Sequence, residues 1–222
     1  MATLSKTSLY EFGSTEAVVR SIQRPIADFF VDRGPVLDIG CGRGTFLELL
    51  AERRVECVGI DHADESLAIC RNKGLSVHKV GAHEFLRVQP GRFGGIFCSH
   101  VVEHLDPVAA TELLQLCFAA LRPGGFLVLI TPNSEDVAVM GEIFWLDLTH
   151  VRPYPAALLR SMLSAEGFEV TRVKKYLGHW RMIGRRNLPA YLWRRIILGR
   201  YFGKPNTLIY AQRPGLAAEQ RG

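Results

Sequence analysis

The fold of this chain is indicated by one stretch, Val36-Leu37-Asp38-Ile39-Gly40-Cys41-Gly42-Arg43-Gly44-Thr45-Phe46. The pattern predicts a buried strand, then a tight glycine turn, then a helix. Glycines at three alternate positions let the backbone pass close to a ligand, because no Cβ stands in the way. The helix start offers unpaired N–H groups to a negatively charged group. Asp61 follows about 20 residues beyond the turn, where a carboxylate can accept hydrogen bonds from ribose hydroxyls. We therefore predict a site for a nucleoside-containing cofactor.

The spacing of the glycines distinguishes between such cofactors. A dinucleotide site has the pattern Gly-x-Gly-x-x-Gly, whereas this turn has Gly40-x-Gly42-x-Gly44 after Asp38. An acidic side chain at the strand end would repel a pyrophosphate, but it can hold the ammonium group of an amino acid. The turn and its carboxylate together resemble motif I of the class I S-adenosylmethionine-dependent methyltransferases.

The resemblance continues along the chain, over about residues 34–175 and the last strand. Residues 93–105 are similar to the fourth strand of that family and the loop after it, and residues 121–133 to the turn into its fifth strand. It implies an α/β, Rossmann-like methyltransferase fold with a seven-stranded, mostly parallel sheet and helices on both faces. We expect one domain over residues 1–222, with an N-terminal helical cap (1–33) and an insertion before the last strand (177–205).

The periodicity of apolar residues independently predicts strands alternating with helices, which indicates a parallel sheet covered on both faces. The predicted elements are helix 14–31, strand 35–39, helix 44–53, strand 55–60, helix 64–73, strand 76–80, strand 94–98, helix 107–121, strand 125–131, helix 155–166, strand 168–174 and strand 206–213.

The resemblance also implies the residues that contact the cofactor. They are Asp38, Gly40 and Gly42 at the methionine end, Asp61 at the ribose, His62 beside the adenine, Ala82 and His83 at the adenine edge, and Ser99 and His100 beneath the methionine.

Methyl transfer to a hydroxyl requires a general base or a metal ion in addition to the cofactor. Glu103 and His104 lie just beyond the fourth strand, and His150 lies beyond the fifth. A neutral imidazole can accept a proton at neutral pH, since its reference pKa is about 6.5. We predict these three as the catalytic residues. One Glu with two His is also a candidate site for a divalent metal, of a kind that suits Mn, Fe or Zn.

Two related groups bear on these residues. The segment around Glu103 and His104 is similar to ubiquinone-pathway O-methyltransferases and to small-RNA terminal 2′-O-methyltransferases. Both have a Glu-x-x-Glu-His motif that helps bind a divalent metal, and here His100 stands at the first Glu. The segment 149–155 is similar to small bacterial methyltransferases that modify surface glycans, and this resemblance implies that His150 is the base or a metal ligand, with Asp147 nearby to orient it. We therefore predict O-methylation of a sugar or lipid-linked glycan hydroxyl. A quinone-precursor phenol, an RNA ribose and a non-catalytic, cofactor-binding subunit are the alternatives.

One segment before the last strand is strongly basic. Ten Lys or Arg residues and no Asp or Glu lie between Arg172 and Lys204, in a chain of net charge +5. Aromatic residues are interleaved with them: Tyr176, Trp180, Tyr191, Trp193, Tyr201 and Phe202. Such a segment favours an anionic partner: substrate, lipid headgroups or nucleic acid. We expect peripheral contact with an anionic membrane through residues 172–204, and nucleic acid is the less favoured partner. A solvated basic face is the alternative.

The composition is that of a globular protein, with 48% hydrophobic and 22% charged residues. Five cysteines lack any Cys-x-x-Cys pair, so buried thiols in a reducing compartment explain them better than zinc or disulfides. No apolar stretch approaches the 18 or so residues that a membrane span needs. We expect a cytoplasmic protein that contacts the inner face of the membrane only peripherally. The sequence does not indicate an oligomeric state.

Overall fold

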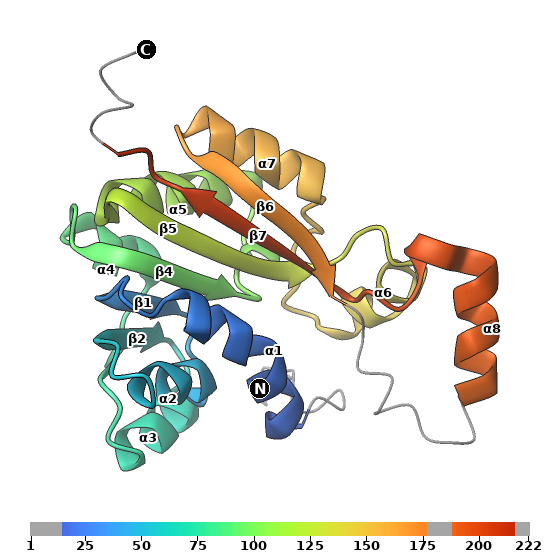
Figure 1. The fold of residues 1–222 in the computed structure, drawn as a ribbon, viewed down its shortest axis with the longest axis horizontal. Coiled ribbons are helices and arrows are strands. Elements are labelled where there is room, and N and C mark those ends of the chain that lie inside the picture. Colours follow the sequence, from blue (N-terminus) through green and yellow to red (C-terminus); the bar gives the residue numbers. More distant parts are fainter. Residues whose placement is uncertain (1–14, 177–187, 216–222) are drawn as a thin grey trace, which may run out of the picture.

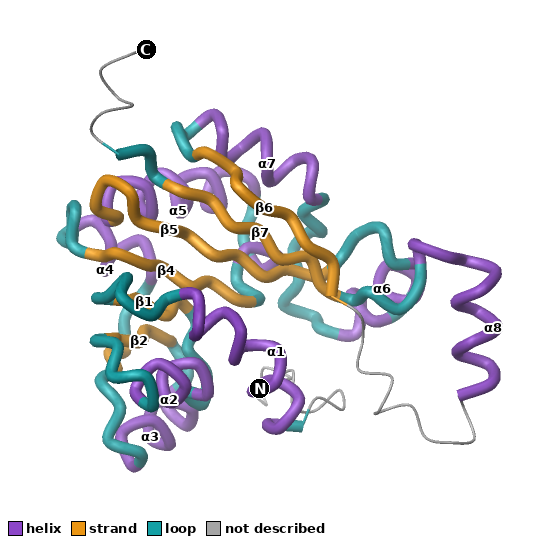
Figure 2. Tube along the Cα trace, in the orientation of Figure 1, coloured by secondary structure: helices purple, strands orange, loops and turns teal. Residues whose placement is uncertain are grey.

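The computed structural model describes residues 15–176 and 188–215, which form an α/β fold around one seven-stranded sheet (Figures 1 and 2). In chain order the strands are β1 (Val36–Ile39), β2 (Cys57–Asp61), β3 (Val77–Lys79), β4 (Phe93–Ser99), β5 (Leu121–Pro132), β6 (Glu169–Tyr176) and β7 (Asn206–Gln212). Their order across the sheet is β3-β2-β1-β4-β5-β7-β6. Strand β7 runs antiparallel to both of its neighbours, and the other pairs are parallel. The predicted fold is confirmed.

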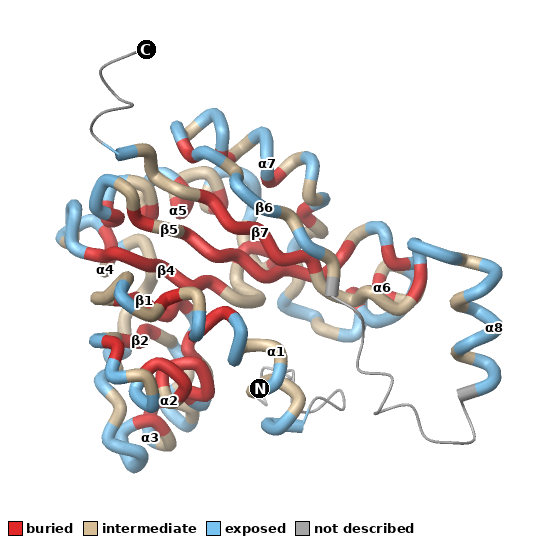
Figure 3. The backbone as a smooth tube through the Cα atoms, viewed as in Figure 1, coloured by how far each residue is buried: buried red, intermediate tan, exposed pale blue. Residues whose placement is uncertain are grey.

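Helices cover both faces of this sheet. In chain order the helices of the described residues are α1 (Glu16–Phe29), α2 (Thr45–Ala51), α3 (Asp64–Asn72), α4 (Ala82–Arg87), α5 (Pro107–Ala120), α6 (Val137–Gly141), α7 (Ala156–Ala165) and α8 (Leu188–Leu198), with short 3-10 helices η1 (Val102–His104), η2 (Ile143–Leu146) and η4 (Gly199–Tyr201). Helix α8 lies to the side of the sheet and covers neither face (Figure 1). The buried residues of Figure 3 follow the strands, so the core lies between the sheet and its helices.

The alternation of side chains along a strand divides this core in two. Leu127 and Leu129 of β5 pack in the cluster that also contains buried residues of α4, α5 and α7. Val128 and Ile130 point the other way, into the cluster formed with α1 and α2. Both faces of the central strands are apolar, as expected for a parallel sheet buried on both sides.

The structure adds elements that periodicity did not predict. Helices α4 and α6 are six and five residues long, too short for a helical repeat to be visible in sequence. Helix α8 lies within the basic segment, where no helix was predicted. Strand β5 begins at Leu121 rather than at the predicted residue 125. Part of the predicted insertion, residues 177–187, lies outside the described residues.

The sheet topology identifies the ligand-binding edge. Strand order reverses beside β1, which lies between β2 and β4. In open α/β sheets, ligands bind at such a switch point, outside the carboxyl ends of the strands. The glycine turn follows β1, and the loops that carry the predicted catalytic residues follow β4 and β5. Among the described residues, no helix combines the length and the apolarity that a membrane span requires.

Candidate active site

The glycine turn is held in a backbone conformation that other residues rarely adopt. Gly40, Gly42 and Gly44 have φ angles of 71°, 51° and 80°. A Cβ at Gly40 would lie 2.7 Å from Val101, and one at Gly44 would lie 2.5 Å from Leu75. A Cβ at Gly42 would meet nothing within 4 Å. The turn is therefore packed at both ends and open in its middle: of the two glycines predicted to line the cofactor, Gly42 borders open space and Gly40 packs against Val101.

Asp61 joins the end of β2 to this turn. Its carboxylate accepts hydrogen bonds from the backbone N–H of Gly42 at 2.9 Å and from that of Ala63 at 2.8 Å. The side chain is only partly buried. Because each carboxylate oxygen can accept more than one hydrogen bond, both oxygens retain capacity for the ribose hydroxyls predicted here.

Asp38 is an acidic residue in the interior, 2% exposed. Burial raises its pKa well above the ordinary value, and the nearby negative charge of Asp61 raises it further. A cationic group placed beside Asp38 would relieve this unfavourable charge. The electrostatics therefore suit the ammonium group that the sequence predicts at this position.

The residues predicted at the adenine end lie in two different settings. The ring of His62 lies beside Gly81, where a Cβ would be 3.5 Å from its Cε1. Ala82 begins α4. The Nε2–H of His83 donates a hydrogen bond to the carbonyl of Ala109 at 2.8 Å, so this ring joins α4 to α5. Ala82 packs against the core cluster on the α4 and α5 side of the sheet, so both residues of this pair also have a structural role.

A buried carboxylate organises the loop after β4. Glu103 is fully buried, and it accepts hydrogen bonds from Nδ1 of His100 at 2.9 Å and from the Thr131 hydroxyl at 3.2 Å. His100 follows Ser99, the last residue of β4, and has a φ of 55°, which is uncommon for a residue with a Cβ. Backbone strain of this kind persists where surrounding contacts fix the conformation, often at functional sites.

His104 faces the loop after β5. Its Nδ1–H points to the carbonyl of Thr149 at 3.1 Å and to the Thr149 hydroxyl at 2.9 Å. That hydroxyl donates in turn to Asp147 at 2.6 Å. Burial lowers the pKa of His104 and outweighs the opposing effect of Glu103. The ring is therefore held neutral near pH 7, with the lone pair on Nε2.

His150 is held in the same tautomer by a different partner. Its Nδ1–H donates to the carbonyl of Phe144 at 2.6 Å, and its ring stacks on that of Phe144 at 4.4 Å. Nε2 of His150 lies 3.9 Å from Asp147, which is too long for a hydrogen bond. We expected Asp147 to orient His150. Instead, the Phe144 carbonyl orients the ring, and the Asp147 carboxylate accepts hydrogen bonds from the N–H and hydroxyl of Thr149.

The structure brings the three predicted catalytic residues together. The rings of His104 and His150 are 4.8 Å apart, and one ligand atom from each of Glu103, His104 and His150 lies within 4.8 Å of the others. A main-chain hydrogen bond joins the two loops: the N–H of Val151 donates to the carbonyl of Glu103 at 2.8 Å. The Tyr154 hydroxyl also donates to the carbonyl of Leu105 at 2.9 Å.

Sequence reasoning missed the residues that hold this cluster in place: Thr131, Phe144, Thr149 and Tyr154. Each of them makes its hydrogen bond either to a residue that is distant in sequence or through a backbone carbonyl. Neither kind of hydrogen bond produces a recognisable spacing of residue types in the sequence. The Pro-flanked Tyr154, in the unusual segment after His150, was the one available signal.

The fold and the glycine turn are those of the class I S-adenosylmethionine-dependent methyltransferases. A family model described as a methyltransferase domain matches residues 14–173. The chain belongs to this methyltransferase-domain family.

Known relatives agree with this assignment. Ubiquinone biosynthesis O-methyltransferases from Leptothrix cholodnii and Pseudomonas aeruginosa are 31% and 32% identical over 124 and 123 residues, covering 51% of this chain and 52% of each relative. The chain thus matches about half the length of these curated relatives. The crystal structure of a SAM-dependent methyltransferase from Archaeoglobus fulgidus has a TM-score of 0.79 and 28% identity, covering 92% of this chain and all of that one.

Proposed function

We propose that this protein is an S-adenosylmethionine-dependent O-methyltransferase. The observation that carries the proposal is the facing pair of imidazoles, His104 and His150, in the loops after β4 and β5 of a methyltransferase fold. Each ring donates its Nδ1–H to a backbone carbonyl, which leaves the two Nε2 atoms as acceptors. An acceptor hydroxyl must lose its proton during methylation, and such nitrogens can take it.

The residues at the ends of β1 and β2 and in the glycine turn fit S-adenosylmethionine, which supplies the activated methyl group. Gly42 leaves open space where a Cβ would stand. Asp38 would pair with the ammonium group, and Asp61 would accept from the ribose hydroxyls while holding Gly42. We propose that His62, Ala82, His83, Ser99 and His100 complete the cofactor pocket together with Gly40.

A divalent metal also fits the cluster of Glu103, His104 and His150. Tetrahedral ligands of one ion, at about 2.0–2.2 Å from it, lie about 3.3–3.6 Å apart, so ligand atoms that now lie within 4.8 Å of one another would have to close by about an ångström. The carbonyl partners of the two Nδ1–H groups are typical of histidines that ligate metals. A bound ion of the Mn, Fe or Zn type would act as a Lewis acid on the acceptor hydroxyl.

Two acceptors are favoured by different observations. The names of the curated relatives favour a quinone-precursor phenol, since both are ubiquinone biosynthesis O-methyltransferases. The likeness of segment 149–155 to glycan-modifying methyltransferases favours a sugar or lipid-linked glycan hydroxyl. We propose a small hydroxyl-bearing acceptor of one of these classes, methylated in the cytoplasm.

An acceptor screen tests the proposal. Purified protein with S-adenosylmethionine would be offered catechol-type phenols, sugars and an RNA 3′ end, and S-adenosylhomocysteine formation would be measured. Each reaction would be run with EDTA and with added Mn²⁺. We expect turnover on a phenol or a sugar. Binding of S-adenosylhomocysteine without turnover on any acceptor would favour a non-catalytic subunit, and turnover on RNA alone would contradict a small-molecule acceptor.

A further inference from the structure

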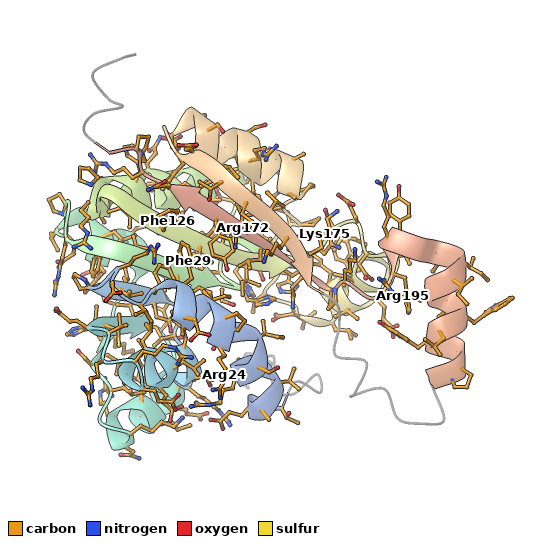
Figure 4. The ribbon with its side chains drawn as sticks, viewed as in Figure 1. Arg24, Phe29, Phe126, Arg172, Lys175 and Arg195 are labelled. Carbon is orange, nitrogen blue, oxygen red and sulfur yellow. The ribbon has the colours of Figure 1, made fainter. Side chains whose placement is uncertain are left out.

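Helix α8 is amphipathic, with its polar and packed side turned toward the protein. Tyr191 and Arg195, one turn apart, face inward. The ring of Tyr191 lies 5.4 Å from that of the buried Phe202, and the guanidinium of Arg195 donates to the Phe202 carbonyl. Figure 4 shows Arg195 on the side of α8 that faces the sheet. One of the arginines of the helix is therefore used to attach it.

The opposite side of α8 is apolar and exposed. Leu192, Trp193, Ile196 and Ile197 are 50%, 64%, 75% and 62% exposed. Their spacing places them on one face of the helix. Four large apolar side chains gathered on one helical face differ from the scattered apolar residues of an ordinary surface, and such a patch indicates an interaction site.

Positive charge borders this face. Arg194 is exposed on α8, and Arg200 is exposed in η4 just after it, where its guanidinium donates to the Tyr201 hydroxyl at 2.6 Å. No Asp or Glu occurs between Arg172 and Lys204. Other cations of the basic segment are used elsewhere. Lys175 pairs with Glu135, and Arg172 lies over the ring of Tyr210. Among the described residues of the segment, the exposed apolar side chains and the arginines next to them thus lie on α8 and η4.

The chain that follows α8 and η4 is anchored to the loop between β5 and α6. Lys204 donates its backbone N–H to Asp136 at 2.7 Å, and its carbonyl accepts from the amide of Asn133 at 2.8 Å. Asn133 and Asp136 are buried in the loop between β5 and α6, upstream of His150. In Figure 1, α6 and α8 both lie beyond the carboxyl ends of β5 and β6. A partner on α8 would therefore meet the protein at the end where the acceptor must enter.

We propose that the exposed face of α8 docks on an anionic lipid bilayer. Aliphatic side chains would enter the boundary between headgroups and acyl chains, Trp193 would lie at the interface, and Arg194 and Arg200 would meet lipid phosphates. In a dimer formed through this face, Arg194 and Arg200 of one copy would lie opposite the same arginines of the other copy, and the like charges would repel. Nucleic acid would use the cations but leave Ile196 and Ile197 in water. This interaction lies beyond the proposed methyl transfer.

Vesicle sedimentation of the full chain tests the proposal without any measurement of activity. The probes are vesicles of phosphatidylcholine alone and of phosphatidylcholine mixed with phosphatidylglycerol. We expect the wild-type protein to sediment with the mixed vesicles and not with phosphatidylcholine alone. Trp193→Ser/Ile196→Ser should abolish sedimentation. Arg194→Glu/Arg200→Glu should lower the partition coefficient by at least about tenfold, since each cation near an anionic surface contributes about a fivefold factor.

Matched controls separate docking from general surface effects. Val88→Ser/Val108→Ser removes two exposed apolar side chains elsewhere, and Arg71→Glu reverses an exposed charge on α3. Both controls should sediment as the wild type does. Sedimentation by the Trp193/Ile196 variant equal to wild type would overturn the proposal. So would a wild-type dimer that this variant converts to a monomer, or a preference for single-stranded RNA over the mixed vesicles.

Discussion

The two halves of the ligand-binding edge are built differently. After β1 and β2, the glycine turn is fixed by close packing at Gly40 and Gly44 and by the Asp61 carboxylate. After β4 and β5, loops are joined to one another by side chain-to-carbonyl hydrogen bonds, and exposed apolar residues such as Trp145 and Leu148 border them. The first half suits a ligand common to a whole family. The second suits an acceptor that differs between family members, because such loops can change without altering the sheet.

The largest expected effect separates chemistry from cofactor binding. His150→Ala should lower turnover by about 10² to 10⁴-fold, because it removes the proposed base or metal ligand. Its affinity for S-adenosylhomocysteine should stay within about twofold of wild type. Steady-state kinetics and calorimetry would measure the two quantities. His78→Ala, at an exposed histidine on β3, is the control and should change neither.

The second effect concerns the open middle of the glycine turn. Gly42→Ala should lower the affinity for S-adenosylhomocysteine by about a hundredfold, because the new Cβ would occupy proposed cofactor space. Gly74→Ala is a matched control, since Gly74 also has a positive φ (73°) and open space around its Cβ. Both variants should lose about 1–2 kcal/mol of stability from backbone strain. Equal affinities in the two variants would remove Gly42 from the cofactor site.

A third, smaller effect concerns Asp61. Asp61→Ala should weaken cofactor binding by about tenfold or more, through loss of hydrogen bonds to Gly42, Ala63 and the ribose. Asp61→Asn keeps one acceptor oxygen and should weaken binding less. Calorimetric titration of both variants would establish the order. If Asn and Ala had the same effect, the negative charge rather than the hydrogen bonding would be the essential property.

The smallest effect is a dependence of stability on pH. Burial lowers the pKa of His104 in the folded protein, so the unfolded chain binds its proton more readily. Stability should therefore fall as the pH drops from about 6.5 toward the folded-state pKa. His104→Gln removes this contribution. Its free energy of unfolding, measured with denaturant at several pH values, should fall less than that of wild type over this window. Parallel curves would contradict the neutral state assigned to His104.

Sequence predicted the first half of the edge more completely than the second. The order Asp38, Gly40, Gly42 and Gly44 is local, and its backbone requirements are visible in the residue types themselves. The clustering of Glu103, His104 and His150 was also predicted, since both loops follow neighbouring strands. The sequence did not predict that backbone carbonyls, and not Asp147, hold the two rings. The hydrogen bonds of His150 and His104 to the carbonyls of Phe144 and Thr149 depend on the shape of the loop and not on residue identity.

Helix α8 was the largest part of the fold that sequence did not predict. Its apolar residues lie on the outer face and Arg195 lies on the inner one, which inverts the pattern of an ordinary surface helix. The composition of the segment indicated an anionic partner. Only the structure shows that the exposed apolar residues lie on α8 and that Lys175 forms an ion pair with Glu135.

The separation of the two halves is tested most directly by calorimetric titration of the wild-type protein with S-adenosylhomocysteine, with and without EDTA. Our proposal predicts micromolar binding that EDTA leaves unchanged, because Asp38, Gly42 and Asp61 hold the cofactor and any metal would lie with His104 and His150. No binding, or binding that EDTA abolishes, would contradict it.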